Sequence, residues 1–194
     1  MQLQQTLRKN YSFEGKGLHT GRIAKMTVCP APADYGIKFV RTDIGPDAVV
    51  EALAENVSNT ARSTTISKGE ASVSTIEHIM SALTGMGVDN AMIEIDNIEV
   101  PILDGSAKPY IDAIWADGFV QQSEPRKYIE IKETVEIVNE EVGSIVRIEP
   151  AEEFSYDITV DFNSRVLGVQ MARWDSSVEY AEEIGVCRTF VFFH

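Results

Sequence analysis

Apolar and polar residues alternate in the first part of the chain, which is the pattern of β-strands that bury one face. Ile37 and Phe39 alternate in this way in one predicted strand, and residues 67–70, Ser-Lys-Gly-Glu, are typical of a hairpin turn between two short strands. Another predicted strand places three apolar residues on one side: Ala24, Met26 and Val28. The pattern therefore predicts a sheet in this part of the chain.

The period changes after Ser74, where apolar residues recur at the spacing of a helix face. This stripe consists of Ile76, Ile79, Met80 and Leu83. Ser74 is the predicted N-cap of the helix, and Gly85 lies at its predicted end. A second helix is predicted to begin after Ser106 and to end at Gly118. Strands followed by helices place the chain in the α+β class.

After a polar stretch at residues 121–125, which ends in proline, the pattern starts again. Residues 143–151 echo residues 21–31, and each of the two segments is followed by an acidic turn and a strand. We therefore expect two copies of one α+β unit, with residues 1–124 as the first domain and residues 125–194 as the start of the second. The polar stretch is the predicted linker.

The second copy reaches only the strand before its first helix, and the chain ends within an apolar run of β character at residues 190–194. We interpret the sequence as the N-terminal piece of a longer protein. In that case the second sheet lacks its helices and exposes an apolar face.

The 194 residues carry a formal net charge of −13. A surface this acidic repels phosphate backbones, so nucleic acid is not an expected partner. No apolar run approaches the roughly 18 residues of a membrane span, so stable membrane insertion is not expected either. Cys29 and Cys187 lie far apart without a CxxC motif, which is typical of free thiols in a reducing cytoplasm.

Residues 74–78, Ser-Thr-Ile-Glu-His, are the strongest candidate for chemistry, and they allow two interpretations. In the first, Ser74 and Glu77 form a capping box and His78 is a surface residue. The second starts from the helix face opposite the apolar stripe. Beside Glu77 and His78 that face carries only small residues: Ser81, Ala82 and Gly85. Small residues let another layer approach closely, and Glu77 and His78 would then be a general base and a metal ligand facing it.

One histidine does not make a catalytic zinc site, which needs about three protein ligands. The other two histidines are His19 and His194. His19 lies in a glycine-rich segment typical of a hairpin turn, and His194 follows aromatic residues, which disfavours a ligand role. Asp104 supplies a turn before the second helix. Thr189 is interpreted as structural unless a site lies beside it.

Four segments carry a more specific signal through their order and spacing. They are Gly17-Leu18-His19-Thr20-Gly21, Ser74-Thr75-Ile76-Glu77-His78, Val100-Pro101-Ile102-Leu103-Asp104-Gly105-Ser106-Ala107 and Arg188-Thr189-Phe190. Together they resemble the UDP-3-O-acyl-N-acetylglucosamine deacetylase (LpxC) family along the whole chain. The resemblance implies two similar domains, each a sheet with two helices on one face, packed helix layer against helix layer with the active site between them.

The resemblance also implies a zinc-dependent deacetylase. Its substrate would be a UDP-linked acylated amino sugar, and the reaction would be the committed step of lipid A synthesis in the cytoplasm of Gram-negative bacteria. Glu77 matches the general base, His78 one zinc ligand, and Thr189 the hydroxyl that stabilises the oxyanion. Three further residues would lie near the substrate: His19, Asp104 and Phe190.

The family's remaining zinc ligands, a His and an Asp on a later helix, have no match in this sequence, and neither has a later catalytic histidine. The resemblance therefore implies one zinc ion in a monomeric full-length enzyme, and no activity for the 194-residue chain alone. Two alternatives stay open. One is a non-catalytic α+β binding module, in which Glu77 is only a cap. The other is a different metal-dependent amidohydrolase, which its substrate would distinguish.

Overall fold

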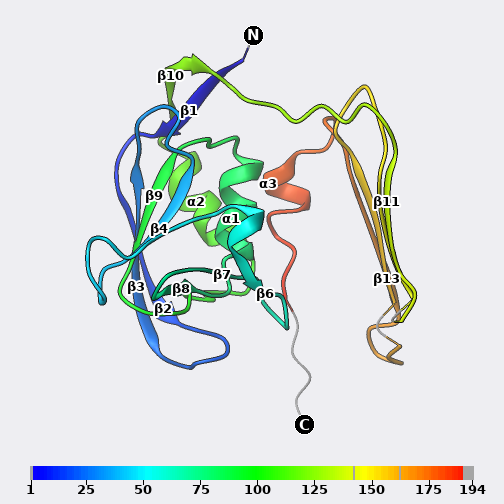
Figure 1. Cartoon of the computed structure of the whole chain (residues 1–194), viewed down its shortest axis with the longest axis horizontal. Coiled ribbons are helices and arrows are strands. Elements are labelled where there is room, and N and C mark those ends of the chain that lie inside the picture. The colour runs from blue at the N-terminus through cyan, green and yellow to red at the C-terminus, as the bar shows by residue number, and fades with distance from the viewer. Residues whose placement is uncertain (1, 142, 162, 190–194) are drawn as a thin grey trace. The chain divides into compact units, whose positions relative to one another are not determined.

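The computed structural model describes residues 2–141, 143–161 and 163–189, and these form two compact units. The first unit contains residues up to Arg126 together with the segment that starts at Tyr180, and the second is Lys127–Glu179. All residues after 124 were predicted to belong to the second domain, whereas in the structure the segment from Tyr180 packs with the first unit. The α+β class is confirmed, since the first unit combines sheets with helices (Figure 1).

A five-stranded sheet with the order β2-β3-β9-β4-β5 forms the framework of the first unit. Its strands are β2 (Tyr11–Lys16), β3 (Ile23–Pro30), β9 (Ala91–Ile95), β4 (Ile37–Arg41) and β5 (Val49–Glu51). The central pair β4 and β9 is parallel and the other pairs are antiparallel. The connection from β4 to β9 includes a helix, as parallel neighbours usually require.

Two smaller sheets complete the strands of this unit. A three-stranded sheet contains β6 (Val57–Asn59), β7 (Thr65–Lys68) and β8 (Ala71–Val73), and it follows the 3₁₀ turn η1 (Ala54–Asn56). The predicted hairpin turn at residues 67–70 is confirmed, since it joins β7 to β8. The other sheet pairs β1 (Leu3–Leu7) with β10 (Phe119–Pro125).

The interpretation of residues 121–125 as a linker is wrong, because these residues lie in β10. They are polar because β10 pairs with β1 alone and most of its side chains are exposed. One of them is also used inside the fold: Gln122 donates to the carbonyl of Ala31 and accepts from Asn90. A polar, proline-terminated segment can therefore be an edge strand.

The first unit contains three helices among the described residues: α1 (Glu77–Gly85), α2 (Lys108–Trp115) and the short α3 (Tyr180–Glu183). Helices α1 and α2 cover one face of the large sheet (Figure 1). The predicted stripe of α1 is confirmed, since Ile79 and Leu83 are fully buried. Ala82, which was predicted to lie away from the core, is fully buried as well.

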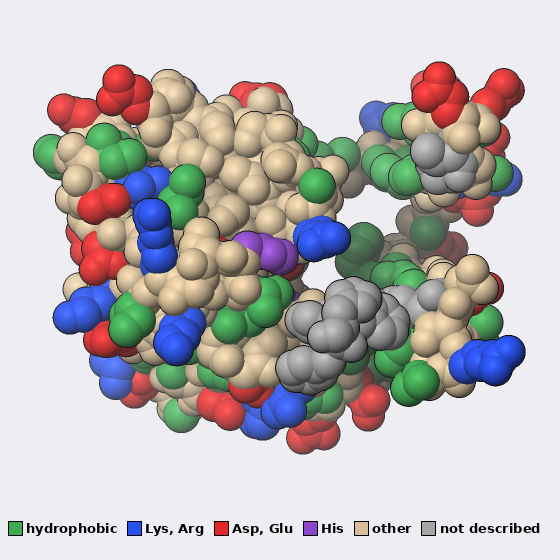
Figure 2. Space-filling view, turned by 90° about the horizontal axis from the view of Figure 1, so that it is seen from below, with side chains coloured by type: hydrophobic (Ala, Val, Ile, Leu, Met, Phe, Trp, Pro, Cys, Tyr) green, Lys and Arg blue, Asp and Glu red, His purple; other side chains and the backbone are tan. Residues whose placement is uncertain are grey.

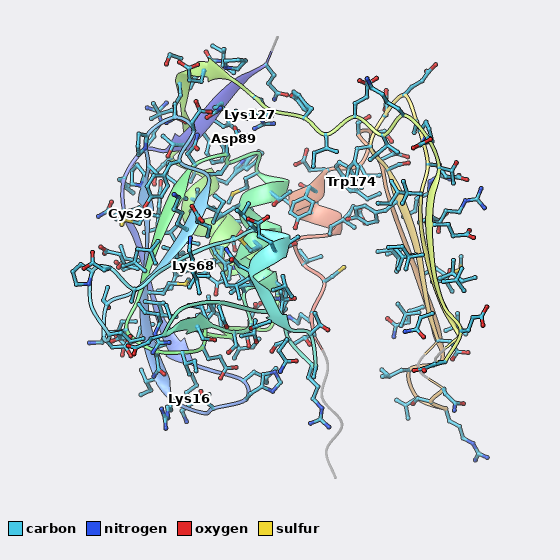
Figure 3. The ribbon with its side chains drawn as sticks, viewed as in Figure 1. Lys16, Cys29, Lys68, Asp89, Lys127 and Trp174 are labelled. Carbon is cyan, nitrogen blue, oxygen red and sulfur yellow. The ribbon has the colours of Figure 1, made fainter. Side chains whose placement is uncertain are left out.

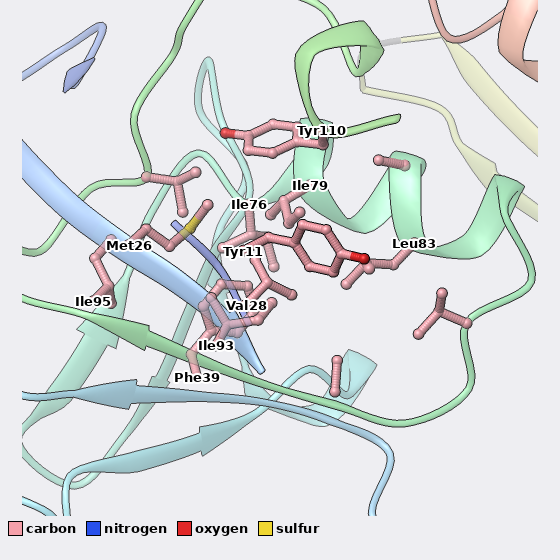
Figure 4. Packing of buried hydrophobic residues seen from close by; sticks show 14 of the residues in the cluster. Tyr11, Met26, Val28, Phe39, Ile76, Ile79, Leu83, Ile93, Ile95 and Tyr110 are labelled. Carbon is pink, nitrogen blue, oxygen red and sulfur yellow. The ribbon is translucent and has the colours of Figure 1, made fainter. Parts of the chain in front are cut away.

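The core lies between the large sheet and these two helices (Figure 4). The sheet contributes alternate residues of its strands: Met26, Val28, Phe39, Ile93 and Ile95. The helices contribute Ile79 and Leu83 from α1 and Tyr110 from α2, each at most 1% exposed. The hydroxyl of Tyr110 donates to the carbonyl of Pro101 at 2.8 Å, so this buried polar atom has a partner.

The second unit consists of two antiparallel hairpins. One pairs β11 (Val135–Asn139) with β12 (Ser144–Ile148), and the other pairs β13 (Tyr156–Asp161) with β14 (Val169–Trp174). Trp174, labelled in Figure 3, stacks on Tyr156 with 5.7 Å between the ring centroids. Apolar side chains are exposed on both hairpins, as with Ile137 and Ile145, which are 66% and 65% exposed.

The helices of the described residues are short, and none of them has the length and apolar character needed to cross a membrane.

Replacing Leu83 with alanine should lower the free energy of unfolding by about 2–5 kcal/mol, because it leaves a cavity where α1 meets the sheet. The neighbouring Thr84 is exposed, so Thr84→Ala is the matched control and should change stability by about 0.5 kcal/mol or less. Urea unfolding followed by helical circular dichroism measures both variants, since the described helices all lie in the first unit. Equal effects of the two substitutions would contradict this placement of the core.

Candidate active site

Main-chain hydrogen bonds join the four segments that the sequence analysis singled out. The amide of Ile102 donates to the carbonyl of Lys16 at 2.9 Å, which links the 100–107 loop to the entry of the glycine-rich loop. The amide of Val100 donates to Ser74 at 3.1 Å, and the amide of Thr189 donates to Gly105 at 2.8 Å. Segments far apart in the sequence therefore meet at one place in the first unit.

The predicted capping box at the start of α1 is wrong. The helix begins at Glu77, and its N-cap residue, Ile76, makes no side-chain cap. Ser74 instead forms an isolated parallel bridge with Glu99, and its hydroxyl donates to the carbonyl of Ile98 at 3.3 Å. Thr75, which lies between Ser74 and the start of α1, has a left-handed backbone with φ 59°. The chain therefore turns sharply before the helix, and Ser74 is directed away from it.

Glu77 is half-buried, and a loop amide holds one of its carboxylate oxygens. Oε2 accepts from the amide of Thr64 at 3.0 Å. Among the described residues no donor contacts the other oxygen, Oε1. The loop that contains Thr64 is also joined to the helix start by the amide of Ile76, which donates to the Thr64 carbonyl at 3.4 Å. The carboxylate is therefore fixed in position with one oxygen available to accept a proton.

His78 follows Glu77 and is half-buried too. Burial lowers the pKa of its imidazole, and the negative charges of Glu77 and Asp104 offset this effect only in part. The described residues make no hydrogen bond to the ring. A neutral imidazole with an available nitrogen is the form of histidine that binds metal ions.

Asp104 lies in the loop that precedes α2. Its Oδ1 accepts from the amide of Ser106 at 3.0 Å and from the Ser106 hydroxyl at 2.7 Å. Its Oδ2 accepts from Arg188 at 3.1 Å. Burial raises the pKa of Asp104, but the bonds from Ser106 and the charge of Arg188 outweigh it, so the pKa is lowered overall. Ser106, the predicted cap of the second helix, also accepts from the amide of Lys108 at 3.2 Å.

Thr189 is held beside the Asp104 loop by its bond to the Gly105 carbonyl. A Cβ atom added to Gly105 would lie 3.3 Å from the Thr189 methyl carbon, and the φ of Gly105 is +82°. The methyl group therefore faces Gly105, and no described residue bonds to the hydroxyl. Phe190, which the sequence analysis placed near the substrate, lies outside the described residues.

His19 is exposed, and its main chain, not its ring, is fixed by the fold. Its amide donates to Oε1 of Glu99 at 2.9 Å. Sequence reasoning missed Glu99, which is 1% exposed. An acidic residue between Ile98 and Val100 fits the alternation of apolar and polar residues in a strand, so the local sequence carries no signal for its burial. In the space-filling view the histidine atoms form one small patch on the first unit (Figure 2).

The small residues of α1 are covered by α3. A Cβ atom on Gly85 would lie 2.0 Å from the ring of Tyr180, so only glycine allows this contact. The Tyr180 hydroxyl donates to the Ser81 carbonyl at 2.8 Å. Close to the end of α3, a Cβ atom on Gly185 would lie 2.4 Å from Ile111 of α2. The short helix is thus fitted against both longer helices, and the chain beyond it leads to Thr189.

Within the described ranges, no group of three or more His, Cys, Asp or Glu side chains is arranged to hold a metal ion. Near the start of α1, His78 has the properties of a ligand, because burial lowers the pKa of its imidazole. Cys29 and Cys187 are free thiols, the first buried and the second exposed. The described residues therefore fit a single ligand of a metal centre and do not form a complete centre.

Fold and site together define an α+β protein that presents a carboxylate and a neutral imidazole at the first turn of a helix, beside a loop and a hydroxyl from distant segments. A sequence profile of the family of UDP-3-O-acyl N-acetylglycosamine deacetylases (LpxC) matches residues 4–194. The chain belongs to this family.

Individual relatives are similar along nearly all of this chain. A protein from Porphyromonas gingivalis named bifunctional enzyme LpxC/FabZ is 46% identical over 99% of the chain and 42% of its own length. A Helicobacter hepaticus protein named UDP-3-O-acyl-N-acetylglucosamine deacetylase is 44% identical over 98% of the chain and 63% of its own length. The chain therefore spans between 42% and 63% of the length of these two relatives.

The 194-residue chain should not bind zinc tightly, since tight sites need three or four converging donors and His78 is a single one. Equilibrium dialysis against zinc tests this directly. A stoichiometric, tight site that His78→Ala abolishes would show that the remaining ligands lie within these residues.

Gly85→Ala should destabilise the first unit, although alanine normally favours a helix over glycine by about 1 kcal/mol. The added methyl meets the Tyr180 ring, and such overpacking costs about 1–3 kcal/mol. In a Tyr180→Ala background the ring is gone, so the same Gly85→Ala change should become stabilising. Urea unfolding of the four proteins completes the cycle, and an equal effect in both backgrounds would show that the ring does not rest on Gly85.

Proposed function

We propose that the chain is part of a zinc-dependent deacetylase that hydrolyses the acetamide of UDP-3-O-acyl-N-acetylglucosamine, the committed step of lipid A synthesis. Glu77, His78 and Thr189 carry this proposal: His78 follows Glu77 and feels the charge of Asp104, and Thr189 donates its amide to Gly105, next to Asp104. Family membership and the name of the Helicobacter hepaticus relative support the choice of substrate.

His78 would hold the zinc ion, and the further ligands would come from residues outside those described. The neutral, half-buried imidazole fits this role. When bound, zinc would polarise the acetamide carbonyl and the attacking water. Asp104 places a negative charge close enough to His78 to act on its pKa, and this charge would favour binding of a cation there.

Glu77 would act as the general base. The bond from the Thr64 amide fixes Oε2, and Oε1 remains to take the proton from the attacking water. The water oxygen adds to the acetamide carbon, the C–N bond then breaks, and the proton passes to the leaving nitrogen. The second proton of the water also ends on this nitrogen, so the products are the protonated amine of the glucosamine unit and acetate, and atoms and charge balance.

Thr189 would stabilise the negative charge that develops on the carbonyl oxygen. Its methyl faces Gly105, which leaves the hydroxyl to donate toward the reacting group. His19 and Asp104 would lie beside the bound substrate, and Phe190 would follow Thr189 there. Removal of one donor of this kind typically costs about 10²–10³-fold in turnover.

In the full-length protein we propose two similar α+β domains whose helix layers face each other, with the site between them. The exposed apolar residues of the hairpins after Lys127 support this, since a sheet of that kind needs a covering layer. The protein would work in the cytoplasm as a monomer, and its free cysteines suit a reducing compartment.

In the full-length protein, Glu77→Gln should lower deacetylation by about 10²–10⁴-fold while zinc content stays normal, because the base is lost and the ligand is kept. Glu70→Gln is the matched control, since Glu70 is exposed in the β7–β8 turn, and it should leave turnover unchanged. Acetate release and metal analysis are the measurements.

Near-normal turnover of the Glu77→Gln enzyme would remove Glu77 from the chemistry. Release of acetate from another acetamide only would identify a different amidohydrolase. No release by the unaltered protein from any acetamide would favour a binding module.

A further inference from the structure

Glu99 is a buried carboxylate that the proposed chemistry does not use. It is 1% exposed, and a charged side chain is almost never buried so completely unless it is paired. Among the residues that the structure describes, no cation forms an ion pair with it. Neutral donors bind it instead, among them the amide of His19 at 2.9 Å, the amide of Thr20 at 2.7 Å and the hydroxyl of Thr75 at 3.0 Å.

These donors come from two different segments. His19 and Thr20 belong to the glycine-rich loop between β2 and β3, and Thr75 lies two residues before Glu77. Burial raises the pKa of Glu99, but the bonds from the two loop residues and from Thr75 outweigh it, so the pKa is lowered. The side chain is therefore an ionised acceptor shared by both segments.

The glycine-rich loop is shaped around this carboxylate. A Cβ atom on Gly17 would lie 2.3 Å from Oε2 of Glu99, so any larger residue would displace the acid. The loop closes on itself through the amide of Gly21, which donates to the Gly17 carbonyl at 3.0 Å. The acid thus occupies the place that a side chain at Gly17 would take.

The other segment is strained where it meets Glu99. Thr75 is β-branched and has φ 59°, a conformation that such residues rarely adopt without outside support. Support comes from both sides of the acid: the amide of Ser74 donates to the Ile98 carbonyl at 2.8 Å, and the amide of Val100 donates to Ser74. The bond from the Thr75 hydroxyl to Glu99 completes this clamp.

We propose that Glu99 is a positioning residue that fixes the His19 loop against the turn that carries Glu77 and His78. This inference rests on the proposed function. The acid touches no reacting atom; it acts by fixing two groups of the site in one geometry, and a displacement of about 1 Å in such a site costs on the order of 10²-fold in rate. Glutamine cannot replace it, since the amide nitrogen is a donor and would face donors.

Glu99→Gln in the full-length protein tests the proposal. We expect kcat per folded molecule to fall by about 10–100-fold. Hydrogen exchange at the amides of His19 and Thr20 should accelerate. Histidine-selective NMR should show the imidazole signals of His19 and His78 moving together, and His78→Ala assigns the second signal. Glu94→Gln, on the neighbouring strand β9, is the matched control and should change none of these.

Thr75→Val is a second variant, and it carries the test if the Glu99→Gln protein fails to fold. It removes one donor and keeps the acid with its two loop amides, so the His78 signal should shift while the His19 amide stays protected. If the Glu99→Gln protein folds, keeps both imidazole signals in place and has an unchanged kcat, the proposal is overturned. A His78 signal that stays in place in the Thr75→Val protein would overturn it as well.

The experiments distinguish a failure of the proposed function from a failure of this inference. If the unaltered protein releases no acetate from the UDP-linked substrate, the deacetylase proposal is wrong, and the exchange and NMR measurements alone then decide the role of Glu99. If the unaltered protein is active and Glu77→Gln is inactive while Glu99→Gln matches the unaltered protein in every measurement, the function stands and the positioning role is wrong.

Discussion

The direction of strand β9 is the constraint on which the site depends. β2 and β9 both pair antiparallel with β3, so they run in the same direction and end at the same edge of the sheet. The glycine-rich loop leaves the end of β2, and the segment with Glu99 and Asp104 leaves the end of β9. Two loops about 80 residues apart in the sequence thereby come together. Helix α1 begins beside them because Ser74, just before the helix, pairs with Glu99.

The alternating and helical patterns were sufficient to predict most of this framework. The inward side of β3 and the buried stripe of α1 follow from local sequence because burial decides them. The β7–β8 turn follows from local sequence because Gly69 adopts a positive φ of 58°. The errors arose where tertiary contacts override local preference. Ser74 looks like a cap but pairs with Glu99, and residues 121–125 look like a linker but form an edge strand whose Gln122 is used inside the fold.

The candidate site was predictable only where the local sequence pattern marks a residue. Glu77 and His78 could be singled out because they lie on a helix face that otherwise carries small residues. Glu99 could not, because its partners include main-chain amides, which leave no complementary charge in the sequence. The loop amide of Thr64 and the ring of Tyr180 were equally hidden, since contacts of this kind depend on where distant backbone passes. Whether the site works as proposed stays a prediction.

The contact of α3 with α1 also sets an order of events during synthesis. Tyr180 is 99 residues later than Ser81, and the whole second unit is translated between α1 and α3. The buried residues of α1 and α2 are therefore all synthesised before Tyr180, which packs against them. Thr189 follows Tyr180 in the chain, so Glu77 and His78 are synthesised well before the hydroxyl of Thr189.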